Sequence, residues 1–188
     1  RFIPLWNRQA FKIDDKFRFW GGLTLEAVGG GKGLSDQLFE IALERGVEVL
    51  CGSEATDLLR NSDGHVTAIR FLGPSGYRCV SAKAVVMACG GFEANPEMRV
   101  RYLGPGWDLA RVRGTRHNMG DGIRIALEIG ARPFGNWSGC HSVGWDISAP
   151  PYGDYEVLDN FQKHSYPWGV MVNLSGERFV DEGEDLRN

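Results

Sequence analysis

Three glycine-rich stretches of this sequence could bring a ligand against the main chain: residues 29–33, 90–91 and 120–122. Glycine has no side chain, so the backbone can turn sharply there and a flat or charged group can approach it closely. The chain has 26 glycines in 188 residues. We interpret each stretch as a candidate binding corner.

The second corner closes a short apolar run. Residues 84–88 contain no charge, which is typical of a strand buried on both faces of a sheet. A buried strand that ends in Gly90 and Gly91 at the edge of an α/β sheet is a common ligand position. Taken alone, the run fits a core strand that ends in a turn. The motifs on either side of it favour the interpretation as a ligand-binding corner.

The first corner precedes a predicted helix, in which apolar residues recur at helical spacing up to a stop at Gly46: Leu34, Leu38, Ile41 and Ala42. Backbone N–H groups at a helix start suit an anion or an electron-rich ring edge. A flexible loop before a helix is the equal alternative. The spacing matches neither a P-loop nor the G-x-G-x-x-G fingerprint of dinucleotide sites.

The elements that position these corners follow from turn signals and periodicity. A short strand is expected at residues 47–50, directly after the helix. Three further strand-like runs at residues 56–60, 65–72 and 77–81, with turn residues at 61–64 and 73–76, predict a β-meander. Asn95-Pro96 predicts a helix to about residue 102, and a second helix follows the third corner, with Asp121 as its cap and Gly130 at its end.

The remaining segments are less regular. Residues 1–22 are interpreted as an irregular connector, and residues 134–168 as a long loop of the kind that wraps a ligand. Two short strands are expected at 170–173 and 178–180. The interval with Arg99, Arg101, Arg111, Arg113 and Arg116 is interpreted mainly as a solvated basic face, with attraction of an anionic substrate as the alternative.

Composition excludes several function classes. The net charge of −3 argues against a nucleic-acid partner, and no apolar run is long enough to span a bilayer. Four widely spaced cysteines without a C-x-x-C pair indicate reduced thiols in a cytoplasmic-type compartment, and no metal site is expected.

Four motifs in order resemble a known family: residues 29–32 before a helix, residues 85–92 with Asn95, residues 118–122, and residues 178–182. Over residues 25–188 the chain resembles the FAD-dependent fumarate reductase/succinate dehydrogenase flavoproteins. Its closing stretch looks most like the tricarballylate dehydrogenase branch, which includes flavoproteins linked to cobalamin biosynthesis. Four weak motifs in the right order are together a strong signal.

The resemblance implies a mixed α+β (α/β) fold in an internal fragment of a longer protein. A partial FAD-binding domain with the β-meander is expected over residues 1–91, and an incomplete α+β capping (catalytic) domain over residues 92–188. The dinucleotide fingerprint is absent from the sequence. The fragment is therefore not expected to retain FAD.

The implied function is a dehydrogenase that moves a hydride between a small polycarboxylate substrate, such as tricarballylate, and N5 of FAD. The resemblance also allows for an electron-accepting partner. It assigns the cofactor to residues at the three corners and one beyond the first helix: Gly30, Gly31, Lys32, Ala55, Ala88, Cys89, Gly90, Gly91, Gly120, Asp121 and Gly122.

The resemblance also implies three catalytic candidates. His141 lies ten residues after Ala131, which is the family's spacing for a substrate-binding histidine. Arg187 follows the Arg-Phe-Val motif with one residue more than the fumarate reductase pattern, so a guanidinium that holds a substrate carboxylate is favoured over a proton donor. Glu182 is a candidate proton relay, with a cap or surface carboxylate as the alternative.

Two other functions stay open. A flavin-dependent dehydrogenase of another substrate, such as a 3-ketosteroid, is compatible because the proton-relay residues of fumarate reductase have no clear match between His141 and Asn173. A non-catalytic binding module that retains family sequence is the third reading.

Overall fold

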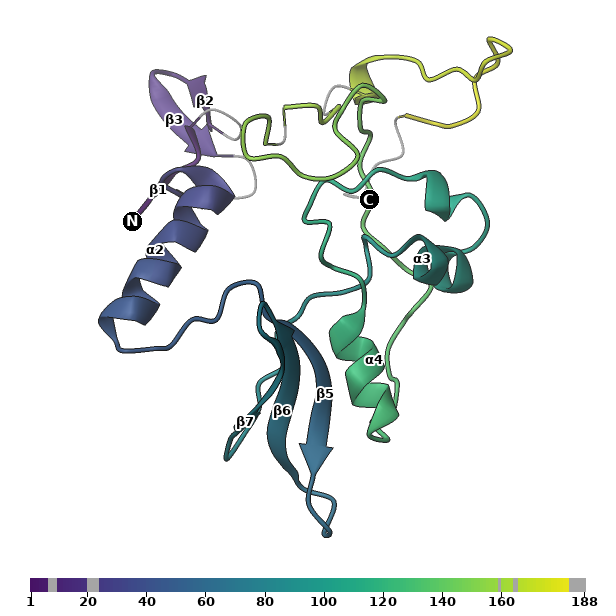
Figure 1. Ribbon diagram of the computed structural model, residues 1–188. Helices are drawn as coiled ribbons and strands as arrows, with labels where there is room; N and C mark the ends of the chain where they lie inside the picture. Colours follow the sequence, from purple (N-terminus) through teal and green to yellow (C-terminus); the bar gives the residue numbers. More distant parts are fainter. Residues whose placement is uncertain (7–9, 20–23, 159, 164–165, 183–188) are drawn as a thin grey trace. The chain divides into compact units, whose positions relative to one another are not determined.

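The computed structural model describes residues 1–6, 10–19, 24–158, 160–163 and 166–182. The chain divides into two compact units, Arg1–Cys51 and Gly52–Asn188. Each unit is described by itself. Figure 1 gives the order of their helices and strands along the chain.

The first unit starts with two small antiparallel pairs. Strand β1 (Phe2–Pro4) pairs with β4 (Leu25–Ala27), and β2 (Ala10–Ile13) pairs with β3 (Lys16–Phe19). The β2–β3 turn consists of Asp14 and Asp15, at φ 49° and 59°. Two positive φ values in a two-residue turn match the twist of a hairpin. For residues 1–6 and 10–19 the expectation of an irregular connector was therefore wrong, and the rest of that stretch lies outside the described residues.

Helix α2 (Gly30–Glu44) completes the first unit. The predicted helix and its stop are confirmed, because Gly46 follows the last turn at φ 74°. The sequence predicted that the glycine stretch is a loop before the helix. In the structure it forms the first turn of the helix, and Gly29 is the N-cap. None of the helix side chains is buried. The apolar side chains that recur at helical spacing along α2 are therefore not covered by other described residues.

The second unit is built on the predicted meander. Strands β5 (Glu54–Arg60), β6 (Val66–Gly73) and β7 (Gly76–Ser81) form one antiparallel sheet in sequence order. The turns fall where Asn, Asp, Gly and Pro were found in the sequence. Ala68 and Phe71 of β6 are buried. The predicted strand at residues 47–50 does not form.

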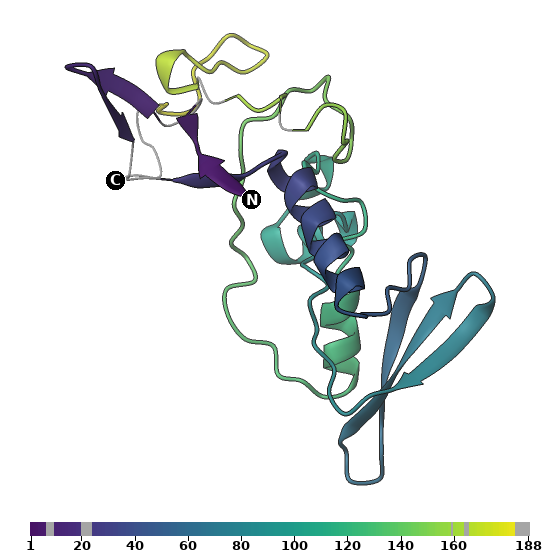
Figure 2. The same ribbon diagram turned by 90° about the vertical axis from the view of Figure 1, so that its left-hand side faces the viewer.

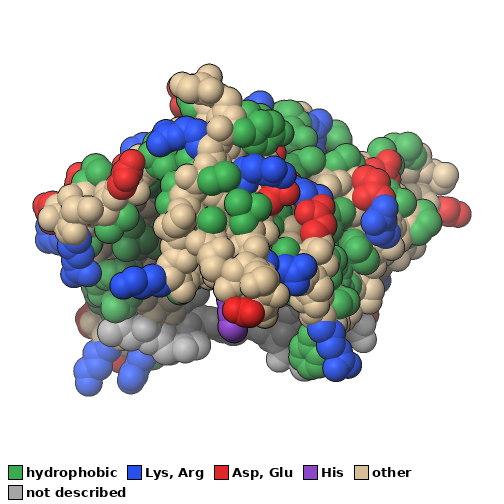
Figure 3. All heavy atoms as spheres, turned by 60° about the horizontal axis from the view of Figure 1, so that its bottom comes forward, with side chains coloured by type: hydrophobic (Ala, Val, Ile, Leu, Met, Phe, Trp, Pro, Cys, Tyr) green, Lys and Arg blue, Asp and Glu red, His purple; other side chains and the backbone are tan. Residues whose placement is uncertain are grey.

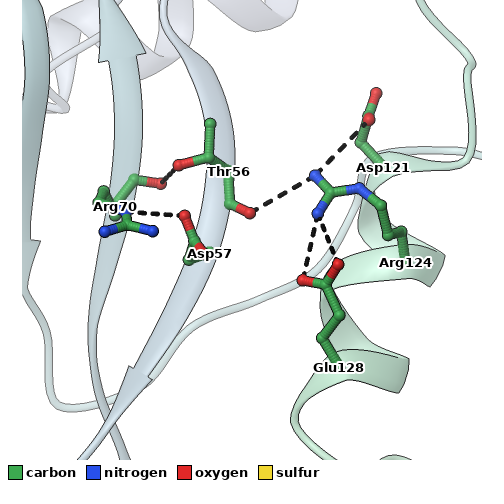
Figure 4. A network of polar contacts seen from close by, with 6 residues as sticks. All are labelled: Thr56, Asp57, Arg70, Asp121, Arg124 and Glu128. Atoms are coloured by element: carbon green, nitrogen blue, oxygen red, sulfur yellow. Dashed lines mark hydrogen bonds and ion pairs between the residues drawn. The ribbon is translucent and has the colours of Figure 1, made fainter.

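Helix α4 (Asp121–Glu128) packs against β5, as Figures 1 and 2 show. Arg124 joins the two elements: its guanidinium donates to Glu128 Oε1 at 2.9 Å and to the Thr56 carbonyl at 3.5 Å (Figure 4). The next residue of the helix, Ile125, is 1% exposed. The N-cap of the helix is Gly120, so Asp121 is not the cap that was expected. The Oδ1 atom of Asp121 lies 3.9 Å from Nη2 of Arg124.

Helix α3 (Pro96–Leu103) forms as predicted. The Asn95 side chain accepts a hydrogen bond from the Met98 N–H at 3.1 Å, and proline occupies the first turn. A short 3-10 turn, η1 (Trp107–Leu109), follows, and another, η2 (Tyr166–Trp168), lies late in the chain. The two strands expected at residues 170–173 and 178–180 shrink to one bridge between Val172 and Arg178.

The structure differs most from the sequence prediction at the apolar run of residues 84–88, which was expected to be a buried strand. It lies in no strand, and its Val86 side chain is 88% exposed. A strand buried on both faces needs neighbouring strands and covering layers, and no described strand pairs with this run. Figure 3 shows many hydrophobic side chains on one face of the molecule among charged ones. Within the described residues, this run is therefore not the buried strand that the sequence predicted.

The mixed helix and strand content that the sequence predicted is confirmed. The capping domain and the boundary between residues 91 and 92 stay predictions. Among the residues that the structure describes, no helix combines the length and apolarity needed to cross a membrane.

Candidate functional site

The second and third glycine corners lie against each other. The Gly120 N–H donates to the Gly91 carbonyl at 3.0 Å, and the Ala94 N–H donates to the Asn118 carbonyl at 2.9 Å. These bonds join the end of the apolar run to the start of α4. Two stretches that are about thirty residues apart in sequence therefore form one local structure, which we call the glycine joint.

Protein side chains occupy the space beside these glycines. A Cβ atom on Gly122 would lie 3.0 Å from Cys89 Cβ, and one on Gly120 would overlap the Met98 sulfur. Gly120 also has φ 85°, which side chains rarely allow. Close packing thus accounts for Gly120 and Gly122, where the sequence suggested bare backbone facing a ligand.

Beside this joint lies a cavity of about 800 Å³ in the second unit, within the usual size range for small-molecule sites. Gly91 and His141, which were predicted for cofactor and substrate, both line it. The other walls are mixed: aromatic and aliphatic side chains alternate with Arg99, Arg111 and Arg113. The structure therefore brings together two of the predicted site residues.

Positive charge dominates the cavity wall. Three arginines line it, whereas Glu93 is the one carboxylate among the described lining residues. Arg111 and Arg113 are exposed, and Arg113 Nη1 donates to Gln162 Oε1 at 3.1 Å. Such an excess of guanidinium groups attracts carboxylates. The basic interval is thus partly a cavity wall and not only a solvated face.

Arg99 departs most from the expected solvated face. It is 7% exposed. Its Nη1 donates to the Glu93 carbonyl at 2.7 Å and its Nη2 to the Asp108 carbonyl at 3.0 Å. The sequence carried a usable signal, because Arg99 and Leu103 are four residues apart on one helix face and both line the cavity.

The other predicted cofactor residues lie elsewhere. Gly30, Gly31 and Lys32 belong to the first turn of α2 in the first unit, where the Lys32 ammonium pairs with Asp36 at 2.6 Å. Ala55 is in β5, opposite Phe71. Ala88, Cys89 and Gly90 are exposed on the extended segment before the glycine joint. Arg187 lies outside the described residues.

Glu182 is a buried anchor in this structure, with a side chain 3% exposed. Its Oε1 accepts from the Met171 N–H, and its Oε2 accepts from Arg178 Nε at 2.9 Å. The Met171 N–H and, next, the Arg178 guanidinium lower the pKa of Glu182 from 4.5 to about 2. A carboxylate with this pKa stays ionised near neutral pH. If Glu182 is to relay protons, its carboxylate must first separate from the Arg178 guanidinium.

This pair makes a prediction for acid solution. Because the folded pKa of Glu182 lies below its unfolded value, the pair stabilises the folded segment above about pH 4.5. That stabilisation is lost as the pH falls through about 2. Hydrogen exchange at the Met171 amide, corrected for intrinsic rates, should therefore lose protection over this window. The Glu182→Gln variant should show no such step, and a step of equal size in the variant would contradict the assignment.

The comparisons with known proteins agree with this picture at the level of the family. Residues 19–187 match the model of the FAD binding domain family, so the chain belongs to that family. It has relatives among the fumarate reductase/succinate dehydrogenase flavoproteins, as the motifs predicted.

One such relative is the probable fumarate reductase Ifc3 of Shewanella frigidimarina, which is 30% identical over 91% of this chain and 27% of the relative. The chain thus spans about a quarter of that protein. Among solved structures, the open conformation of a flavocytochrome c3 fumarate reductase has a TM-score of 0.53 at 32% identity, over 58% of this chain and 20% of that one. The 3-ketosteroid delta1-dehydrogenase of Sterolibacterium denitrificans has 0.52 at 32%, over 55% and 19%.

The residues present fit part of an FAD site. The segment with Ala88, Cys89 and Gly90 is exposed and lies in no described strand, although the Asn118 side chain lies close beside Gly90. Gly90 ends this segment at φ 76°. The fingerprint that holds the cofactor pyrophosphate is absent from the sequence.

Proposed function

We propose that this chain is part of an FAD-dependent dehydrogenase or reductase that acts on a carbon–carbon bond of a polycarboxylate, with tricarballylate as the model substrate. The observation that carries the proposal is the cavity where the glycine joint, His141 and three arginines meet. When bound, FAD accepts or supplies the hydride. The chain's own residues bind and orient the substrate beside it.

His141 and the arginines divide the binding work in this proposal. The imidazole donates a hydrogen bond to one substrate carboxylate, and Arg111 and Arg113 balance the remaining negative charge. Arg187 holds a further carboxylate, and Glu182 serves as proton relay once it is released from Arg178. An electron-accepting partner reoxidises the flavin, and the proposed compartment is the cytoplasm.

A dehydrogenase of a neutral ring compound is the second candidate. The similarity to a 3-ketosteroid dehydrogenase favours it, as do the apolar residues of the same cavity: Phe92, Leu103, Trp107, Leu109 and Val112. The two candidates separate in substrate trials on the full-length protein with an artificial electron acceptor. Turnover of tricarballylate supports the first, and turnover of a 3-ketosteroid alone supports the second.

The domain proposal follows from the same reasoning. Residues 1–91 form part of the FAD-binding domain and residues 92–188 form part of a capping domain, as the family resemblance implies. Neither part holds the pyrophosphate fingerprint.

The cofactor proposal makes a direct prediction. The 188-residue chain should lose FAD during gel filtration, because it lacks the glycine-rich loop that holds the pyrophosphate of a dinucleotide at a helix N-terminus. The full-length protein should elute yellow with about one FAD per chain. Retention of stoichiometric FAD by the short chain would show that its described glycine corners suffice.

A further inference from the structure

The segment that carries His141 is attached to the second unit by few contacts. Among residues 131–142 only Trp137 is not exposed. Within the described part of the chain, no hydrogen bond joins residues 132–143 to another segment, because the bonds there stay between residues 134 and 138. Residues 139–143 nevertheless all line the cavity. The place of His141 therefore depends on what holds Trp137.

The Trp137 ring packs against helix α3. Its centroid lies 4.9 Å from that of Tyr102, with the two planes tilted by 59°. The Tyr102 ring lies in turn 5.4 Å from the ring of Phe92, at a tilt of 52°. Both separations fall in the range of favourable aromatic pairs. Phe92, Tyr102 and Trp137 thus form one aromatic cluster, with Tyr102 in the middle.

The far end of the aromatic cluster reaches the glycine joint. Phe92 follows Gly91, whose carbonyl accepts the Gly120 N–H at 3.0 Å. A Cβ atom on Gly120 would lie 3.2 Å from Phe92 Cβ, so Phe92 also packs beside the third glycine corner. Phe92 lines the cavity as well. Tyr102 therefore connects the glycine joint to the segment of His141.

The link between Trp137 and the cavity wall is a closed turn. The Asn136 Oδ1 atom accepts from the Ser138 N–H at 3.0 Å and from the Ser138 hydroxyl at 2.9 Å. The Trp137 Nε1–H donates to the Phe134 carbonyl at 3.2 Å. These bonds fix the chain on both sides of the tryptophan, so a ring held at Tyr102 also fixes the start of residues 139–143.

Loss of the Trp137 contact would free a much longer loop. The nearest backbone bonds on either side are those of Ala131, which donates to the Ala126 carbonyl at 3.0 Å, and Gly144, which accepts from Lys163 at 2.8 Å. His141 would then lie in a loop that is tied at residues 131 and 144 instead of 137 and 144. A longer free loop has more conformations, so His141 would hold its place less often.

We propose that Tyr102 is a positioning residue for the reaction: through Trp137 it holds the His141 imidazole at a fixed place relative to the glycine joint. This inference deepens the proposed function and rests on it for the role of His141. A misplacement of about 1 Å between reacting groups can cost about 100-fold in rate. The Tyr102 ring therefore matters for turnover although it does not line the cavity.

The kinetic test uses the full-length FAD-loaded protein and the Tyr102→Leu variant, which removes both ring contacts. Its kcat/KM for tricarballylate should fall about tenfold, a partial loss of the positioning effect. In the His141→Ala background the same substitution should lower kcat/KM no further, because Tyr102 acts through the imidazole. A loss of equal size in both backgrounds would overturn the inference.

Three further variants separate positioning from general damage. Tyr102→Phe keeps the ring and removes a hydroxyl that interacts with the exposed Arg101, so it should retain wild-type kcat/KM. Tyr77→Leu makes the same replacement on β7, where the ring lies over the Arg70 guanidinium at 5.7 Å and outside the cavity, and it should also match the wild type. Trp137→Leu breaks the same contact and leaves α3 intact, so it decides the question if Tyr102→Leu does not fold.

A second measurement needs no substrate. Chymotrypsin cleaves after aromatic residues, and the Trp137 ring must leave Tyr102 before the protease can bind it. Cleavage between Trp137 and Ser138 in the full-length protein, followed by mass spectrometry, should be about two- to tenfold faster in Tyr102→Leu, as expected for the loss of one aromatic pair. Tyr102→Phe and Tyr77→Leu should be cleaved like the wild type. Equal cleavage of Tyr102→Leu and the wild type would overturn the inference.

The two measurements distinguish the inference from the proposed function. Turnover of a 3-ketosteroid alone would refute the polycarboxylate proposal, and the comparison of the two backgrounds with that steroid would then decide the positioning role. Full-length protein that turns over neither substrate would refute the proposed function. The cleavage rates would in that case decide whether Tyr102 holds the segment of His141.

Discussion

Replacement of His141 by alanine in the full-length protein is expected to lower kcat/KM for tricarballylate by about 100-fold. The imidazole lies on the wall of the arginine-lined cavity, and a lost hydrogen bond to a charged group accounts for an effect of this order. Steady-state kinetics with an artificial electron acceptor measure it. FAD content should stay unchanged, because His141 lies outside the glycine joint.

His65→Ala is the matched control. His65 is exposed at the turn between β5 and β6 and does not line the cavity. It should leave kcat/KM unchanged. Equal activity of the wild type and the His141→Ala variant would contradict the substrate role and favour a non-catalytic module, which also predicts no effect for Arg187→Ala.

Gly33→Ala and Gly31→Ala are expected to change the stability of the first unit in opposite directions. A Cβ on Gly33 would overlap the carbonyl oxygen of Val28, a backbone atom that cannot rotate away. Overpacking of this kind costs about 1–3 kcal/mol. A Cβ on Gly31 meets no atom within 4 Å, so alanine there should stabilise α2 by about 0.5–1 kcal/mol.

The pair forms its own control, because both glycines lie in the first turn of α2 at ordinary helical backbone angles. Urea unfolding of the 188-residue chain, followed by helix signal in circular dichroism, measures the difference. If Gly33→Ala proves as stable as Gly31→Ala, the first turn of α2 does not pack against Val28.

Elements with local signals could be predicted from the sequence. The turns at residues 61–64 and 73–76 carry residues that favour tight bends, and the meander strands fall between them. The Asn95-Pro96 pair sets the start of α3, because the Asn95 side chain caps the first turn and the fixed φ of Pro96 suits the first helical position. In each case the deciding contacts lie within a few residues.

Features that depend on distant partners could not be predicted. The run around Val86 reads as a buried strand, yet burial needs neighbouring strands, and none is described beside it. Arg99 reads as a solvated charge, yet backbone carbonyls from two other segments hold it inside. The cavity itself arises from segments between residues 91 and 147. Gly91 and His141 were predicted as site residues from the sequence, and the four-residue spacing of Arg99 and Leu103 was a further signal, but the assembly of these segments around one cavity was not predicted.

The most direct test of the account is anaerobic addition of tricarballylate to the full-length protein, with the flavin absorbance as the readout. We predict that the yellow protein bleaches as hydride reaches the flavin, and that the His141→Ala variant bleaches far more slowly at the same substrate concentration. A flavin that stays oxidised with tricarballylate but bleaches with a 3-ketosteroid would contradict the polycarboxylate assignment. A colourless full-length protein that does not take up added FAD would contradict the proposed function as a whole.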